Sequence, residues 1–584
     1  MKTKRTSESG MALVMALFFA GISVALVGVL TASLMSQRNL VNRSLIKKEC
    51  FDGVEAAYAS CKAKLQNGEE GKVGLDGWTA AKPFVLPSFT TSGITPVHMS
   101  TLPNVQYFSI AQNWFNDGID NNKNGVLDAA DSAEFQKYTI HSFARNQGQI
   151  RQTEAVVVAT DINVWRNAIF AGNGQAGGLI NGNVSIHGSV HLLGANLADT
   201  TMAIAAIDLS GTSMVHNNYG GLDATLRSMV PTLPTVSLGG ETVETLNANL
   251  RVKNGTVGLS GNSEIGQPNA TGNTTKEMMD GTYVNDGWTG NKSTPTADGR
   301  GMPTSVYSDN GYNNKYDVGD LVPFPTLDSD YRSPGTGAKV WNNATGKYYT
   351  HDEYFTQVLV ASPGNPTDGI LNQSLSLDVS GQAKTALYWN ATKNVLSTGG
   401  TNAAPSAVAA YAAAATAPVS TDDYMYFNPA TNLLVINGQI KINGGLTIVG
   451  QGNDKTVNYT GRGSIMATQD VALDTNLLSC NNGNTGSYAN SFPVNNFFGI
   501  MTRTNMNVGT TSQLNLVGAF YAMGTIKTTK QSNIMGTFVA SYFDMGTNVP
   551  SIYQVPSLAD NLPLGMIGNY PILAMQQVTW REMT

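Results

Sequence analysis

The sequence of 584 residues is poor in charge and in cysteine. Charged residues make up 13% of the chain, about half their share in an ordinary soluble domain. The formal net charge is −6, so the basic excess of a nucleic-acid-binding protein is missing and DNA and RNA are not expected as partners. The three cysteines are too few for a disulfide framework and lack zinc-binding spacing.

Two of the cysteines, Cys50 and Cys61, fall in a predicted helix. Their separation along its axis is about 16 Å, which is too far for a disulfide bond. We therefore expect the cysteines to be small, half-buried thiols.

Sequence motifs for catalysis are also scarce. The chain has no G-x-x-x-x-G-K-[ST], no G-x-S-x-G and no H-E-x-x-H. Residues 172–177 match G-x-G-x-x-G, but a strand-like segment follows them, so a turn is predicted. His187 and His191, and likewise Asp470 and Asp474, are four residues apart, about 13 Å in a strand. The histidines are too far apart to bind one metal ion, and the aspartates are too far apart to act as a catalytic carboxylate pair. The chain is therefore predicted not to be an enzyme. The alternative is a polysaccharide-active β-solenoid enzyme.

The N-terminus carries the clearest pattern. Basic residues precede Gly10, and residues 11–35 contain no charged side chain. This run is long enough to span a bilayer and longer than the apolar region of a secretory signal peptide. Mixed basic and apolar residues follow to about residue 65, which predicts one helix about 80 Å long.

These features resemble the type IV pilin superfamily and its PilX-type N-terminal domain. The resemblance rests on Gly10, on the run AlaLeuValMetAlaLeu from Ala12 and on EAAYASCKAKL from Glu55. It implies cleavage after Gly10 by a prepilin peptidase, methylation of Met11 and packing against other pilin-like subunits. Major pilins carry glutamate at the fifth mature position, where this chain has Met15. In lacking this glutamate, the chain resembles the pilin-like subunits that initiate or cap a filament.

A calcium loop is predicted at residues 120–131. Its spacing matches an EF-hand loop, with Gly125 at the sharp turn. An Asx-rich turn without metal is the alternative. The predicted Ca²⁺ ligands are Asp120, Asn122, Asn124, Val126, Asp128 and Asp131.

The rest of the chain is β-rich. Alternating β-branched residues between 105 and 161 predict a small antiparallel pilin-like sheet. Short glycine-punctuated strands predict a right-handed β-solenoid, since GAFYA at Gly518 and GTFVA at Gly536 repeat eighteen residues apart. A β-sandwich or barrel is the alternative.

An insertion rich in proline, asparagine and aromatic residues interrupts the solenoid, with short helices predicted within 348–362 and 406–417. Its aromatic side chains are expected either to form a lobe core or to contact a glycan or a protein. They are Trp288, Tyr307, Tyr312, Tyr331, Trp341, Tyr348 and Tyr349.

The predicted fold is α+β and then mainly β: a long N-terminal transmembrane helix, a small antiparallel sheet and a β-solenoid-like region with an insertion. The predicted segments are a leader (1–10), the transmembrane and stalk helix (11–65), a pilin-like β region (66–162), a first solenoid segment (163–280), the insertion (281–430) and a second solenoid segment (431–584).

The predicted function follows from the resemblance. It is that of a non-catalytic minor pilin of a type IV pilus or a type II secretion pseudopilus, acting in assembly, tip presentation and adhesion. Its predicted location is the bacterial inner membrane, through residues 11–35, and after assembly the periplasm or cell surface. The alternative is a single-pass, membrane-anchored adhesin or structural protein that is not processed as a pilin.

Overall fold

The chain forms two compact units in the computed structural model. Unit 1 comprises Met1–Ala159 and Met575–Thr584, and unit 2 comprises Thr160–Ala574. Unit 2 is therefore inserted into the sequence of unit 1. The structure describes residues 8–66, 72–75, 86–113, 137–161, 163–176, 180–197, 204–296, 300–312, 323–334, 337–360, 370–379, 387–390, 397–398, 423–428, 431–450, 456–545, 550–570 and 573–583.

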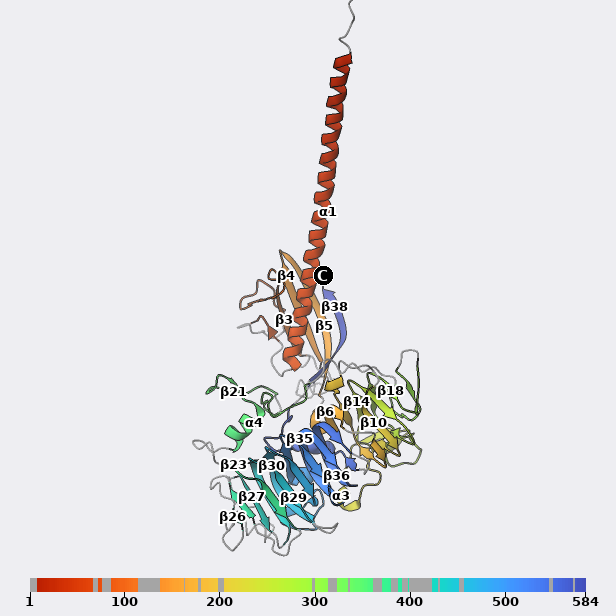
Figure 1. The fold of residues 1–584 in the computed structure, drawn as a ribbon, viewed down its shortest axis with the longest axis vertical. Coiled ribbons are helices and arrows are strands. Elements are labelled where there is room, and N and C mark those ends of the chain that lie inside the picture. Colours follow the sequence, from red (N-terminus) through yellow and green to blue (C-terminus); the bar gives the residue numbers. More distant parts are fainter. Residues whose placement is uncertain are drawn as a thin grey trace, which may run out of the picture. The chain divides into compact units, whose positions relative to one another are not determined.

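Unit 1 consists of a long helix and an antiparallel sheet (Figure 1). Helix α1 spans Glu8–Gln66, and the strands lie in the order β1-β3-β4-β5-β38, with β2 on β3. The long helix and the antiparallel sheet confirm the predicted fold of this region of the chain. The strands are β1 (Lys72–Val73), β2 (Val97–His98), β3 (Gln106–Asn113), β4 (Lys137–Asn146), β5 (Gln149–Asp161) and β38 (Leu573–Met583).

Strand β38 is the element of unit 1 that the sequence does not predict. The sequence pattern places residues 573–583 in the second solenoid segment, whereas the strand is the neighbour of β5 in the unit 1 sheet. The chain thus returns to unit 1 after more than 400 residues, from Thr160 to Ala574, in unit 2. Pairing over such a separation leaves no local signal in the sequence.

Unit 2 is built mainly from short parallel strands stacked side by side. Its first segment contains β6 (Ile169–Gln175), β7 (Ile180–Gly182), β8 (Ser185–His187), β9 (Val190–Leu192), β10 (Ala205–Gly211), β11 (Met214–His216), β14 (Asn249–Val252), β15 (Thr256–Leu259), β16 (Glu264–Ile265), β17 (Gly281–Val284) and β18 (Trp288–Thr289). Its second segment contains β23 (Ile370–Leu371), β24 (Leu375–Asp378), β28 (Leu433–Ile442), β29 (Leu446–Val449), β30 (Thr456–Ala467), β31 (Val471–Asp474), β32 (Asn476–Ser479), β33 (Phe497–Thr502), β34 (Met506–Val508), β35 (Asn515–Thr528), β36 (Asn533–Asp544) and β37 (Ser551–Tyr553).

The core of unit 2 is organised in columns of apolar side chains, one from each successive strand. Parallel in-register pairing places equivalent residues above one another about 4.8 Å apart, so each inward side chain is covered by the next rung. One column runs without interruption through both segments of the chain, and each member is at most 1% exposed. Its members are Ile440, Ile465, Ile500, Phe520, Phe538, Ile169, Val190 and Leu250.

The predicted eighteen-residue repeat is one step of this stack. Gly518 pairs with Gly536, and Phe520 pairs with Phe538, in parallel register. Parallel stacking of successive short strands is what a solenoid requires, while the right-handed coil stays a prediction.

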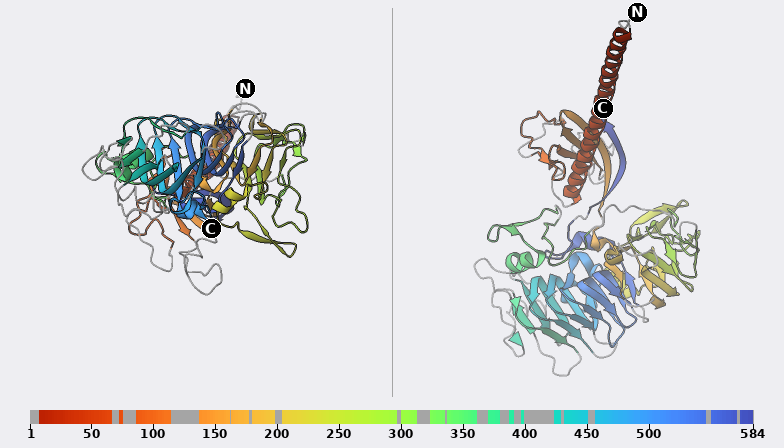
Figure 2. Two further views of the ribbon diagram at one scale, coloured as in Figure 1. Left: turned by 90° about the horizontal axis from the view of Figure 1, so that it is seen from below. Right: turned by 45° about the horizontal axis from the view of Figure 1, so that its top comes forward.

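The chain enters and leaves the stack at its middle. Strand β6, the first of unit 2, pairs with β36, near the end of unit 2. In Figures 1 and 2 the blue strands consequently lie between the green and the yellow ones. The rungs also extend past the predicted boundaries of the insertion: β17 and β18 pair in parallel with β14 and β15, and β23 and β24 pair in parallel with β28 and β29.

Short elements decorate the stack. Helix α3 (Ala224–Met229) starts at Asp223, whose carboxylate accepts the Thr225 backbone N–H, and α4 (His351–Tyr354) starts at Thr350 with a capping box to Glu353. A π-helical turn, Phe355–Val360, continues α4, so the helix predicted in this stretch is present. The 3-10 turns are Val164–Arg166, Ala195–Leu197, Asn481–Gly483 and Pro556–Asn561, and Ser491–Asn495 is a second π-helical turn.

Several antiparallel strands complete unit 2. Strands β25 and β27 pair antiparallel with one another, and β27 pairs antiparallel with β28. The antiparallel strands are β12 (Thr235–Leu238), β13 (Glu241–Glu244), β19 (Ser293–Thr294), β20 (Met302–Pro303), β21 (Trp341–Asn342), β22 (Lys347–Tyr348), β25 (Leu387–Asn390), β26 (Ser397–Thr398) and β27 (Tyr424–Asn428).

Candidate functional site

The first half of α1 is an apolar surface that no described residue of unit 1 covers. Met11 is 67% exposed and Leu34 is 64% exposed, and large apolar residues between them share this exposure. The described region of the chain contains one helix that is long and apolar enough to cross a membrane, namely α1, with a mean hydropathy of 2.7 in its most apolar window. Gly10 and Met11, the predicted processing residues, both lie in this helix.

The second half of α1 packs on the unit 1 sheet along one stripe. Cys50, Val54, Ala57, Cys61 and Leu65 are buried, and their spacing of three or four residues places them on one helix face. This stripe accounts for the amphipathic pattern of the predicted stalk.

Gly53 lies within the same stripe and sets the distance between helix and sheet. A Cβ at Gly53 would lie 2.5 Å from Val105 Cγ1 and 3.0 Å from Ala144 Cβ. The Ser109 hydroxyl donates to the Ala57 carbonyl at 2.8 Å, and Asn146 Nδ2 donates to Glu49 Oε2 at 2.6 Å. These contacts fix the helix on the sheet at several turns.

Strand β38 is fastened to β5 and to α1 by its side chains. Arg581 forms an ion pair with Glu154 at 2.7 Å, and Arg151 forms one with Glu582 at 2.6 Å. Trp580 meets Phe51 edge to face, with 5.6 Å between ring centroids. The sequence pattern placed these residues in the second solenoid segment; the alternation of apolar Val578 and Trp580 with polar residues could have indicated a strand, but not its partner.

The three cysteines are free, and all three are fully buried where half-buried thiols were predicted. Burial raises the pKa of the Cys61 thiol to about 12, and that of Cys480 to about 12. The protonated thiol is a poor nucleophile, so these cysteines contribute packing.

The two histidines considered as a metal pair are packed separately. His187 belongs to β8 and His191 to β9, so they do not share one strand as predicted, because the chain bends between them at Gly188. The His187 ring stacks on His216 and Tyr553 at 4.5 and 4.3 Å between centroids. Among the residues that the structure describes, no cluster of histidine, cysteine or acidic residues could hold a metal ion.

The two aspartates considered as a carboxylate pair accept hydrogen bonds from neighbouring loops. Asp474 Oδ1 accepts the Thr511 backbone N–H at 3.0 Å, and its Oδ2 accepts the Thr510 hydroxyl at 3.0 Å. Asp470 Oδ1 accepts the Asn505 backbone N–H at 3.1 Å. Both carboxylates thus contact neighbouring turns of the stack.

The G-x-G-x-x-G segment begins in strand β6, and its first glycines serve close packing. A Cβ at Gly172 would lie 2.9 Å from Phe324 Cγ, and one at Gly174 would lie 2.6 Å from the Ala206 carbonyl oxygen. The predicted turn is therefore wrong for residues 172–175, which are extended because β6 is a rung of the stack.

The aromatic residues of the predicted insertion range from buried to exposed, and Tyr307, Tyr312 and Tyr349 are half-buried. Trp288 and Tyr331 are 4% and 5% exposed and belong to the core, whereas Trp341 and Tyr348 are 49% and 43% exposed. The exposed pair forms an edge-to-face contact at 5.0 Å between the two strands of the β21–β22 hairpin. Some of these aromatic side chains are therefore available for contacts with other molecules.

Two sequence predictions lie outside the described residues. The calcium loop at 120–131 falls within residues 114–136, and the helix predicted at 406–417 falls within residues 399–422. Both stay predictions.

Comparisons with known proteins include a similar solved structure. No protein-family model and no curated protein matches the chain. The crystal structure of the competence-associated pilin ComZ from Thermus thermophilus is similar over 92% of this chain and 97% of that one, at 17% sequence identity and a TM-score of 0.42. At this level of similarity no conclusion about the fold or function of the present chain follows.

Proposed function

We propose that this chain is a non-catalytic pilin-like subunit, a minor pilin of a type IV pilus or of a related type II secretion pseudopilus. The observation that carries the proposal is the division of α1. Its first half exposes apolar side chains, and its second half is fixed to an antiparallel sheet. The PilX-like N-terminal sequence supports the same function.

The exposed half of α1 requires an apolar environment. Twenty-five uncharged positions from Met11 to Met35 span a bilayer, and a continuous apolar surface of that length associates or aggregates in water. We place it in the bacterial inner membrane before assembly. In a filament the same surface would pack against the helices of other pilin-like subunits, and unit 2 would be presented at the tip or the cell surface for adhesion.

Leader processing distinguishes a pilin from a fixed anchor. With an active prepilin peptidase, we expect the mature chain to begin at a methylated Met11, as measured by the mass of the N-terminal peptide. Without the peptidase, Met1 should remain at the N-terminus. A matched Gly10→Val variant should stay unprocessed both with and without the peptidase, since a β-branched residue at this position blocks cleavage.

The contrary result is equally clear. If the leader persists in the presence of an active peptidase, the chain is a membrane-anchored surface protein that does not enter a pilin-type filament.

Calcium is proposed to stiffen the loop at 120–131. We expect millimolar calcium to raise the thermal unfolding temperature of the full chain, because carboxylate and carbonyl oxygens in this spacing suit Ca²⁺. An Asp120→Ala/Asp128→Ala variant should lose the shift, and magnesium at the same concentration serves as the control ion. An unchanged unfolding temperature in calcium would contradict the metal site.

A further inference from the structure

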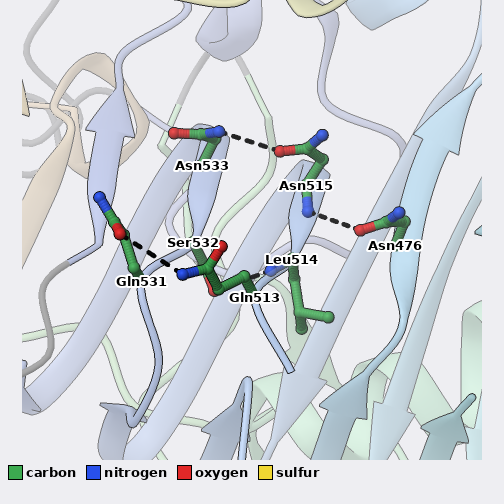
Figure 3. A pocket seen from close by; sticks show the side chains of 7 residues that line it. All are labelled: Asn476, Gln513, Leu514, Asn515, Gln531, Ser532 and Asn533. Carbon is green, nitrogen blue, oxygen red and sulfur yellow. Dashed lines mark hydrogen bonds between the residues drawn. The ribbon is translucent and has the colours of Figure 1, made fainter. Parts of the chain in front are cut away.

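A shallow hollow of about 360 Å³ lies on the side of the unit 2 stack, across strands β32, β35 and β36. Amide side chains dominate its lining, and we call it the amide groove: Asn476, Gln513, Asn515, Gln531 and Asn533. Its volume lies within the range of small-molecule sites. Figure 3 shows these side chains in two rows that cross the strands.

The first row is an asparagine ladder. Asn515 and Asn533 are register partners in β35 and β36, and Asn533 Nδ2 donates to Asn515 Oδ1 at 3.0 Å. The Asn515 backbone N–H in turn donates to Asn476 Oδ1 at 2.8 Å. Three rungs of the stack therefore present one aligned row of amides (Figure 3).

The second row consists of two glutamines immediately before the same strands. Gln513 Nε2 donates to Gln531 Oε1 at 3.4 Å. Between the rows, the Leu514 backbone N–H donates to the Ser532 hydroxyl at 3.2 Å, and both of these side chains are buried. The floor of the groove is thus fixed, and the polar groups stand along its two sides.

Each row keeps hydrogen-bonding capacity for another molecule. Among the residues that the structure describes, Asn515 Nδ2, Asn533 Oδ1, Gln513 Oε1 and Gln531 Nε2 have no hydrogen-bond partner. Each row therefore offers a free donor and a free acceptor. Turning an amide over would exchange donor and acceptor but would not remove either.

The chemistry of the lining excludes several classes of ligand. Among the residues that the structure describes, no acidic or basic side chain lines the groove, so neither a cation nor a phosphate would find a compensating charge there. Strand β35 is already paired with β33 and β36 on its two edges, so a peptide could not add to it as a strand. Sugar hydroxyls, which both donate and accept, match neutral amides.

We propose that the amide groove binds a neutral linear glycan, whose hydroxyl groups exchange hydrogen bonds with Gln513, Gln531 and Asn533. Both rows advance by one residue from β35 to the neighbouring β36, which suits a ligand made of repeating units. The inference goes beyond the proposed function, because glycan binding by unit 2 does not depend on whether the leader is processed.

The test measures binding of neutral hexasaccharides to the full chain, kept in a detergent without a sugar headgroup. The probes are cellohexaose, maltohexaose and chitohexaose, with an alginate hexasaccharide as the charged comparison, and binding is followed by calorimetry. We expect at least one neutral probe to bind with a Kd in the millimolar range or tighter. A Gln513→Met/Gln531→Met variant, which keeps side-chain length and removes the amides, should weaken that binding about tenfold.

A matched control removes an amide pair elsewhere on the stack. Asn443 Nδ2 donates to Asn372 Oδ1 at 2.7 Å at an exposed position, and an Asn372→Ala/Asn443→Ala variant should bind like the unmodified chain. If the double Met variant fails to fold, Asn533→Ala carries the same expectation.

Three results would overturn the proposal: no neutral probe binds, alginate alone binds, or the groove variant and the control bind equally well. The last of these, accompanied by a lower unfolding temperature of the groove variant, would show that the amides only stabilise the stack. Because the leader is not involved, this outcome is independent of the processing experiment.

Discussion

Replacing Gly536 by alanine is expected to destabilise unit 2 by about 4 kcal/mol or more, which places it among the largest effects of a single substitution. Gly536 has a φ of +145°, a conformation essentially restricted to glycine. A Cβ there would also overlap the carbonyl oxygen of Gly518 on the preceding rung. The clashing oxygen belongs to the backbone of β35, which is paired with β36. It therefore cannot move aside without breaking hydrogen bonds of the sheet. Thermal unfolding followed by circular dichroism measures the effect.

The control for backbone strain alone is Gly239→Ala. Gly239 also has a positive φ, +59°, but a Cβ there would meet nothing within 4 Å. We expect this variant to lose about 1 kcal/mol. Equal losses in the two variants would show that contact between the rungs at Gly536 is not what requires glycine.

Acid is expected to destabilise unit 2 by several kcal/mol between pH 6.5 and about pH 5. Burial lowers the pKa of four histidines from 6.5: to about 3 for His187 and His191, and to about 4 for His216 and His351. The unfolded chain therefore binds these protons at a higher pH than the folded unit does. The stability conferred by the neutral rings is complete above 6.5 and is lost as the pH falls toward 4, at a rate of about 1.4 kcal/mol per histidine and pH unit.

A substitution at His191 tests the contribution of a single histidine to this pH dependence. Its ring is fully buried beside Phe170, and among the described residues neither ring nitrogen has a hydrogen-bond partner. His191→Leu should therefore reduce the dependence of the unfolding free energy on pH by one histidine's share, without loss of stability at neutral pH. Leu192→Met, a volume-conserving change at the next buried position, should leave the pH dependence unchanged. Denaturant titrations at several pH values measure both, and identical slopes would contradict the role of His191.

Local patterns in the sequence predict the long helix and the repeat. The uncharged run from Met11 to Met35 and the mixed basic and apolar residues that follow it to about residue 65 are local patterns, so they predicted α1 from nearby residues alone. The repeat at Gly518 and Gly536 likewise predicted the register of β35 and β36, because adjacent rungs must fit closely at the same position.

The order of the rungs and the partner of β38 depend on contacts between residues far apart in the sequence. A parallel rung offers the same backbone donors and acceptors to any other strand, so the column that joins Phe538 to Ile169 is selected by side-chain packing across the stack. The Arg581–Glu154 ion pair also joins residues that are far apart in the sequence, so it forms only where tertiary packing places β38 beside β5. The amide groove also depends on this order, because Gln513 and Gln531 lie side by side only when their strands are neighbours. Local sequence patterns specify which segments form strands, whereas non-local packing specifies which strands meet.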